Sequence, residues 1–168
     1  MAKKLSALHQ ELIPYLYYRD AGAAAEFLGK AFGFQLRGMH KDDAGHVMHA
    51  ELGVGKSAVM LGAASEQFGF KSPSELPARH AGVWCYVDDA DAHCAHARAS
   101  GATIVREPCD QFYGVREYTA RDLEGQEWFF ATPLAGAVAP QRKKKPARSA
   151  KASAKARSRP AKRRAAKK

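Results

Sequence analysis

The stretch Ile13-Pro14-Tyr15-Leu16-Tyr17-Tyr18-Arg19-Asp20 returns in the middle of the chain as Gly82-Val83-Trp84-Cys85-Tyr86-Val87-Asp88. Each copy reads as an aromatic strand that leads into an acidic helix start, and an alanine-rich helical stretch follows each copy. These helical stretches end at Gly33 and Gly101, so Asp20 and Asp88, like the two glycines, stand 68 residues apart. A repeated unit of this kind predicts two similar modules that pack as one domain, with a cleft between them.

Charge divides the chain into two parts. The 168 residues carry a formal net charge of +10, yet 14 of the 27 Lys and Arg residues, and no Asp or Glu, follow Gln141. Residues 1–141 therefore hold 13 basic and 17 acidic side chains. The last part has no Leu, Ile, Val or aromatic residue whose burial could offset the entropy lost on ordering. We expect a single-core domain over residues 1–134, followed by a linker and a disordered basic tail over residues 135–168.

Cysteine content and hydropathy suggest a compartment. Cys85, Cys94 and Cys109 are an odd number and show no close-pair spacing. We find no signal peptide, and no apolar run approaches the roughly 20 residues of a membrane span. These features predict reduced thiols in a cytoplasmic protein with no membrane partner. The basic tail also allows nucleoid association or, in a eukaryotic host, a nuclear address.

The hydrophobic pattern predicts the order βαβββ twice. In the first module we expect a helix that Asp20 caps and Gly33 ends, with strands at 12–18, 34–40, 46–53 and 56–61. In the second we expect a helix at 89–99 and strands at 81–87, 103–107, 114–121 and 127–131. The modules cover about 10–62 and 80–133, and a long loop at 63–79 joins them. The fold class is therefore α+β.

Seven short motifs follow one another along these elements. They are Pro14-Tyr15-Leu16 before Asp20, Ala31-Phe32-Gly33-Phe34, His49-Ala50-Glu51-Leu52, Tyr86-Val87-Asp88-Asp89, Gly101-Ala102-Thr103, Phe112-Tyr113-Gly114-Val115-Arg116-Glu117 and Arg121-Asp122-Leu123-Glu124-Gly125-Gln126-Glu127-Trp128. In this order they resemble the vicinal oxygen chelate superfamily, which includes glyoxalase I and the bleomycin-resistance proteins. The resemblance implies paired βαβββ modules, each with a curved sheet around a cavity, usually in a homodimer. Because that superfamily spans enzymes and pure binders, the fold alone does not fix the chemistry.

The resemblance also implies where a metal would lie. In metal-dependent members the four ligands come from the first and last strands of each module, which correspond here to Ile13, Leu61, Gly82 and Phe129. None of these side chains can coordinate a divalent ion, so we expect an apolar floor and no cofactor.

Two other metal sites are alternatives. A slip of two residues keeps the same strand faces and brings in Glu11, His80 and Glu127, which would make the protein a metal-dependent lyase, isomerase or dioxygenase. His93 and His96 lie three apart on the second helix, where we expect a solvated face, with a surface metal clamp as the other interpretation.

Alternating strand residues are the candidates for lining a ligand cavity. They are Tyr15, Tyr17, His49, Glu51, Trp84, Tyr86, Tyr113, Arg116, Tyr118 and Trp128. Aromatic walls with a few polar groups suit a flat, partly apolar small molecule. Core packing is the alternative for Trp84 and Trp128, and pairing with Glu117 or Asp122 is the alternative for Arg116. We assign no catalytic residue, because the sequence offers no credible Ser/His/Asp or Cys/His set.

The tail resembles the Lys/Ala/Pro-rich extensions of linker-histone-like proteins. Its cations should bind any nucleic acid by releasing counterions, and without aromatic side chains it should read no sequence. The residues at its densest points include Arg142, Lys143, Lys144, Lys145, Arg148, Lys162, Arg163 and Arg164. Three hypotheses follow: a metal-free small-molecule binder like the resistance proteins, a metal-dependent enzyme, and a nucleoid or chromatin accessory protein that the domain dimerises.

Overall fold

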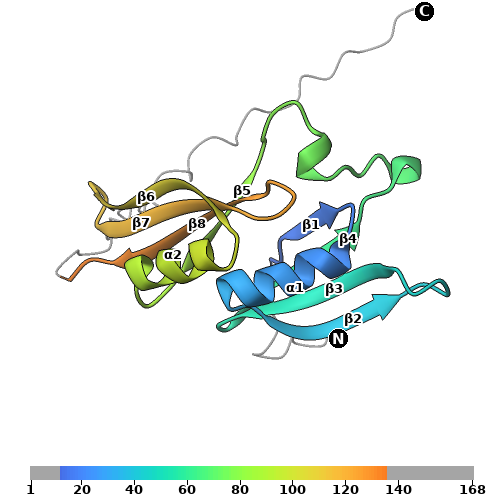
Figure 1. Cartoon of the computed structure of the whole chain (residues 1–168), viewed down its shortest axis with the longest axis horizontal. Coiled ribbons are helices and arrows are strands. Elements are labelled where there is room, and N and C mark those ends of the chain that lie inside the picture. Colours follow the sequence, from blue (N-terminus) through green and yellow to red (C-terminus); the bar gives the residue numbers. More distant parts are fainter. Residues whose placement is uncertain (1–11, 136–168) are drawn as a thin grey trace, which may run out of the picture.

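A computed structural model describes residues 12–135 as two four-stranded sheets, each with one helix on one face (Figure 1). The first module comprises β1 (Tyr15–Tyr18), α1 (Ala21–Phe32), β2 (Gln35–Lys41), β3 (Val47–Val54) and β4 (Ser57–Ala63). The second comprises β5 (Gly82–Tyr86), α2 (Ala90–Ala99), β6 (Thr103–Gln111), β7 (Val115–Arg121) and β8 (Glu127–Pro133). The sheet orders are β1-β4-β3-β2 and β5-β8-β7-β6, which confirms the predicted α+β fold with the βαβββ order repeated.

Local capping signals set the helix ends. The Asp20 side chain accepts a hydrogen bond from the Ala23 N–H at 2.9 Å, and Gly33 ends α1 with a φ of 71°, which favours glycine. Both predictions for α1 are confirmed. Helix α2 is capped by Asp89 rather than Asp88. The repeat offset is therefore 68 at the glycines but 69 at the helix caps.

Two strand boundaries differ from prediction by more than two residues. Strand β1 begins only at Tyr15, because Pro14 has no N–H to donate to a sheet. Strand β6 continues past Pro108 to Gln111, which an edge strand with an irregular register tolerates. The predicted structureless loop contains the short helical turns η1 (Glu66–Phe68) and η2 (Pro73–Glu75).

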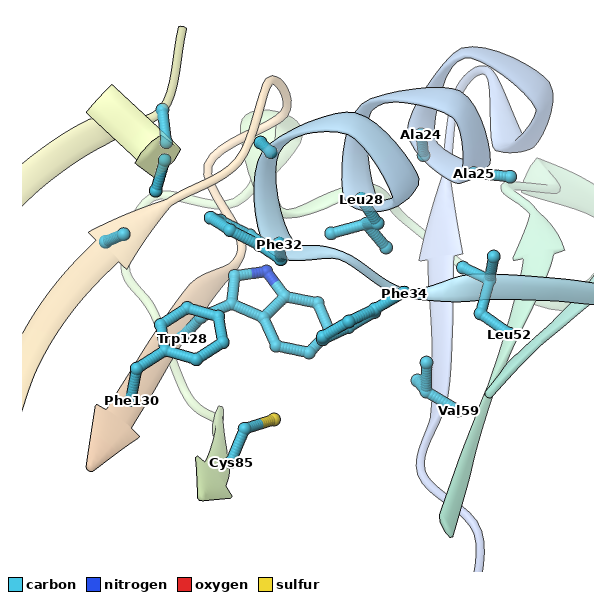
Figure 2. Packing of buried hydrophobic residues seen from close by; sticks show 14 of the residues in the cluster. Ala24, Ala25, Leu28, Phe32, Phe34, Leu52, Val59, Cys85, Trp128 and Phe130 are labelled. Atoms are coloured by element: carbon cyan, nitrogen blue, oxygen red, sulfur yellow. The ribbon is translucent and has the colours of Figure 1, made fainter. Parts of the chain in front are cut away.

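One hydrophobic core joins the two modules. The end of the first helix supplies Phe32 and Phe34, which pack around Trp128 of β8 with ring centroids 5.9 and 5.4 Å away (Figure 2). Phe130 lies 4.8 Å from Phe32, and both Trp128 and Phe130 are fully buried. Helices α1 and α2 lie side by side over this core, and within residues 12–135 neither helix covers the opposite face of either sheet (Figure 1).

The turn between β7 and β8 fastens the second module to the first. The buried Glu124 carboxylate accepts hydrogen bonds from the backbone N–H groups of Arg19 and Asp20, at 2.9 and 3.0 Å, and from the Ser72 hydroxyl. Asp122 accepts from the Tyr18 hydroxyl at 2.6 Å and from the Trp128 indole N–H at 3.0 Å. These bonds fix the position of the second module relative to β1.

The linker and tail predicted at 135–168 lie outside the described residues, apart from Ala135. No helix within residues 12–135 is long and apolar enough to cross a membrane.

Candidate ligand-binding site

The first strand of each module carries a pair of aromatic side chains on the face of the sheet that points away from the helix. Leu16 of β1 pairs with Leu61, and Cys85 of β5 pairs with Phe130, and all four side chains point toward the helices. Because side chains alternate along a strand, Tyr15 and Tyr17 point the other way in the first module, as do Trp84 and Tyr86 in the second. Tyr15, Trp84 and Tyr86 are 45, 41 and 65 % exposed. The two modules thus present aromatic pairs at equivalent positions.

Four predicted cavity residues lie together on the open face of the first sheet. The Tyr15 hydroxyl lies 3.2 Å from His49 Nδ1, and Glu51 forms an ion pair with Arg37 at 3.8 Å. Burial, with Tyr17 alongside, raises the pKa of Tyr15 above its usual value. Gly62 lies behind both tyrosine rings, where an added Cβ would come within 3.0 Å of the Tyr15 hydroxyl oxygen.

The open face of the second sheet has a larger aromatic surface. Trp84 stacks on Phe129 with centroids 6.1 Å apart, and it contacts Tyr86 and Tyr113 at 6.1 and 6.3 Å. Beside it the buried Glu117 carboxylate accepts a hydrogen bond from the Tyr113 hydroxyl at 2.8 Å and pairs with Arg106. Our sequence reasoning missed Glu117 and Arg106 as site residues, although strict alternation along β7 places Glu117 on this face.

Three of the predicted cavity residues point away from this face. Tyr118 and Trp128 are fully buried core residues, and Arg116 binds Asp91 of α2 and Asp110 of β6, each at 2.9 Å. Trp128 packs in the core, as the alternative predicted, and it also borders a hollow beside β5. The partners predicted for Arg116 were wrong, because residues at even positions of β7 face the helix side of the sheet.

His93 is partly buried against α1, whereas His96 stays exposed while it also contacts α1. His93 Nε2 donates to the Phe32 carbonyl at 3.2 Å, which leaves Nδ1 to accept from the Tyr118 hydroxyl at 2.5 Å. His96 Nε2 donates to the Lys30 carbonyl at 2.8 Å. Burial lowers the pKa of His93 below its usual value, so the ring is neutral at pH 7. The predicted solvated face therefore holds for His96 and fails for His93, and both Nε2 atoms are engaged by carbonyl groups of α1.

Two hollows border the aromatic pairs along the seam between the modules, and a third, of about 520 Å³ between the end of α1 and the start of α2, also reaches Tyr86. The first, which we call the loop cavity, has a volume of about 400 Å³ and lies between β1 and the inter-module loop. Tyr15, Tyr17, Phe70, Lys71 and His80 are among its lining residues. The second, which we call the β5 groove, has a volume of about 280 Å³ and is lined in part by Trp84 and Tyr86. Each aromatic pair is therefore open to a molecule that enters its own hollow.

Comparison with known proteins assigns the family. The model of the Glyoxalase/Bleomycin resistance protein/Dioxygenase superfamily matches residues 9–130. The chain belongs to this superfamily. Uncharacterized protein Rv0887c of Mycobacterium tuberculosis is 32 % identical over 126 residues, which cover 73 % of this chain and 74 % of the relative.

Solved structures agree with the fold. The crystal structure of TioX from Micromonospora sp. ML1 is 30 % identical and matches with a TM-score of 0.60 over 75 % of this chain and 100 % of its own. A glyoxalase/bleomycin resistance protein/dioxygenase family enzyme from Burkholderia phytofirmans PsJN is 24 % identical, with a TM-score of 0.59 over 71 % of this chain and 95 % of its own. At that identity the second likeness shows the fold alone.

The described residues do not fit the metal site of the metal-dependent superfamily members. Leu61, which we placed on the cavity floor, is buried against α1, and its open-face neighbour Met60 is no ligand for a hard cation. Gly82 and Phe129 do lie on the open face but offer no donor atom. Among residues 12–135, no three His, Cys, Asp or Glu side chains converge where they could hold a metal ion.

The slipped metal set fits no better. The Glu127 carboxylate lies on the open face, 3.5 Å from Arg121 Nε and 3.7 Å from Arg79 Nε. It is therefore already paired with two cations. Val59, which the same slip of two residues puts in the fourth position, points into the core, and Glu11 lies outside the described residues.

The cysteines offer no evident nucleophile. All three are free, and only Cys109 is exposed. Burial raises the pKa of Cys85, which borders the β5 groove, to about 12. Its thiol therefore stays protonated and unreactive at pH 7.

Proposed function

We propose that this protein binds a flat, partly apolar organic molecule against the aromatic pairs of β1 and β5, without a catalytic metal, in the manner of a resistance protein. The observation that carries the proposal is the matched pairs, Tyr15 with Tyr17 and Trp84 with Tyr86, each partly exposed beside its own hollow. Aromatic rings with polar tips bury large area against a planar ligand and orient it through a few hydrogen bonds.

Binding of the neutral probe 1-naphthalenemethanol, measured by calorimetry, tests this function. Tyr17→Leu and Trp84→Leu each remove one ring from a hollow, and loss of one aromatic contact should weaken binding roughly fivefold at the hollow concerned. Phe68→Leu is the matched control, because Phe68 is exposed but lines neither hollow. Equal affinity in all three variants would contradict the proposed site.

The proposal that the protein works without a metal rests on Glu127, whose carboxylate pairs with Arg79 and Arg121 instead of being free to bind a metal ion. Elemental analysis of the purified protein should find no stoichiometric Zn, Ni, Mn or Fe. One equivalent of metal that is lost in Glu127→Gln or His80→Ala would instead favour the metal-dependent lyase, isomerase or dioxygenase.

We further propose a two-fold homodimer. Uncovered sheet faces and the edge strands β2 and β6 present apolar side chains and unpaired backbone edges that a second copy would cover. Light scattering at micromolar concentration should give twice the chain mass of 18.3 kDa. A particle of the single-chain mass would argue against the dimer.

The composition of the tail favours a second function, nonspecific nucleic-acid binding. Fourteen cations and no acidic residue follow Gln141, whereas residues 1–141 are net negative. If on the order of 8 phosphates are neutralised, a plot of log K against log salt concentration should have a slope of about −7. The slope should be the same for unrelated duplexes, because phosphate contacts carry no sequence information. Removal of residues 141–168 should abolish binding. Retained DNA binding by residues 1–140 would show that the domain, not the tail, carries this function.

A further inference from the structure

The inter-module loop holds Lys71 between two anchored neighbours. On one side, Phe70 exchanges backbone hydrogen bonds of 2.9 and 2.8 Å with Ser65 and stacks on Tyr17 with centroids 4.1 Å apart. On the other side, the fully buried Ser72 hydroxyl binds Glu124. The backbone at Lys71 is therefore set before any ligand arrives, which lowers the entropy cost of using its ammonium group. In Figure 1 this loop is the green segment between β4 and β5.

The charge of the loop cavity is opposite to that of the surrounding domain. Its lining includes Lys71 and His80 and no Asp or Glu, although residues 12–135 contain 16 acidic and 11 basic residues. Glu75, the acidic residue of η2, already accepts the Ser72 N–H at 2.9 Å. Within the described part of the chain, neither Lys71 nor His80 takes part in a hydrogen bond or ion pair, so their donors remain available.

The β5 groove has no such charge. It is lined by aliphatic, small and aromatic residues with no Lys, Arg, His, Asp or Glu among them. The loop cavity and the β5 groove border equivalent aromatic pairs, so Lys71 and His80 are what distinguish the loop cavity from the β5 groove. We therefore expect a preference for anions at the loop cavity, because the third hollow, beside Tyr86, is lined by Asp88 and Asp89.

We infer that the loop cavity takes a planar aromatic anion, with its ring beside Tyr15 and Tyr17 and its carboxylate toward Lys71 and His80. The inference rests on the proposed function and adds the charge class of the ligand and its location. A volume of about 400 Å³ lies within the roughly 300–1,000 Å³ of small-molecule sites. Aromatic walls supply the contact area, the Lys71 ammonium group selects the charge, and the His80 ring offers a further hydrogen-bond donor.

Three probes that share one ring system test the inference by calorimetry on the full chain: 1-naphthoate, 1-naphthalenemethanol and 1-naphthylmethylammonium. We expect naphthoate to bind tightest and the ammonium probe weakest. Lys71→Gln should weaken naphthoate binding roughly fivefold, as expected for one partly exposed charge pair, and should leave the neutral probe unchanged. Lys56→Gln, an exposed lysine in the β3–β4 turn, is the matched control.

The outcomes separate the inference from the function on which it rests. Equal affinity for the three probes, or equal loss in the two lysine variants, would overturn the anion preference while small-molecule binding stands. If none of the probes binds, the proposed function and this inference both fail. A thermal unfolding curve for each variant shows whether it is folded. We expect both variants to fold, because neither lysine is buried.

Discussion

Replacement of Glu124 by Ala should destabilise the domain strongly, although Glu124 lies in a turn. Its carboxylate is buried and accepts three hydrogen bonds, from the Arg19 and Asp20 N–H groups and from the Ser72 hydroxyl. Arg19 and Asp20 lie between β1 and α1, and Ser72 lies in the inter-module loop, so one substitution removes two bonds to the first module and one to the loop.

The magnitude follows from these partners. A hydrogen bond to a charged group contributes about 1.5–3 kcal/mol to stability. Arg19 and Asp20 are exposed, so water can reach their freed N–H groups, and Ser72 keeps a contact of 2.8 Å with Ser74. We therefore count about 1 kcal/mol for each of the three bonds, below that range, and expect a loss of about 3 kcal/mol for Glu124→Ala and about half of that for Glu124→Gln. The exposed Arg19 ion pair at 3.7 Å adds little.

Urea unfolding at a fixed protein concentration measures the loss, because the m-value stays the same when only stability changes. Leu123→Ala alters the neighbouring turn residue, which is exposed, and should cost less than about 1 kcal/mol. Ser72→Ala, combined with Glu124→Ala, should give a coupling energy of about 1 kcal/mol. If Glu124→Ala and Leu123→Ala cost the same, the turn does not fasten the modules as described.

Three further predictions concern pH and the tail. Because burial lowers the native pKa of His93, the wild-type free energy of unfolding should fall as pH drops below about 6.5, and His93→Gln should lack this component. Burial raises the native pKa of Asp122, so its contribution to the free energy of unfolding is full below about pH 4 and is lost as pH rises through the native pKa. Asp122→Asn should remove this pH dependence from the free energies measured by urea unfolding. Removal of residues 141–168 should leave the thermal midpoint unchanged, and a marked drop would show that the tail packs on the domain.

Short-range signals predicted the architecture well. A capping carboxylate and a glycine that adopts positive φ act within a few residues, so Asp20 and Gly33 could be assigned from the sequence. The repeat of aromatic strand and alanine-rich helix was enough to place two modules in order. Tyr15, Tyr17, Trp84 and Tyr86 then followed from alternation along two strands.

The faces of the other strands were harder to predict. Between the modules the offset changes from 68 to 69, and a shift of one residue moves a side chain to the opposite face of a sheet. Leu61 was for this reason placed on the cavity floor, where Met60 lies instead. Arg116 and Tyr118 were misplaced in the same way on β7.

Contacts between distant segments left no signal in the sequence. Ser72 and Glu124 are 52 residues apart, and their hydrogen bond is what positions Lys71 at the loop cavity. His93 and His96 likewise find carbonyl acceptors on α1, more than 60 residues away. A helix pattern alone could not distinguish such partners from solvent.

The central claim, that a planar ligand binds beside the aromatic residues of β1, is tested most directly by fluorine NMR of protein labelled with 3-fluorotyrosine. The chain has six tyrosines, and Tyr18 and Tyr118 are fully buried on the helix side of the sheets. Titration with whichever naphthalene probe binds tightest should shift the Tyr15 and Tyr17 resonances and leave those of Tyr18 and Tyr118 in place. Saturable binding that leaves Tyr15 and Tyr17 unshifted would contradict the account.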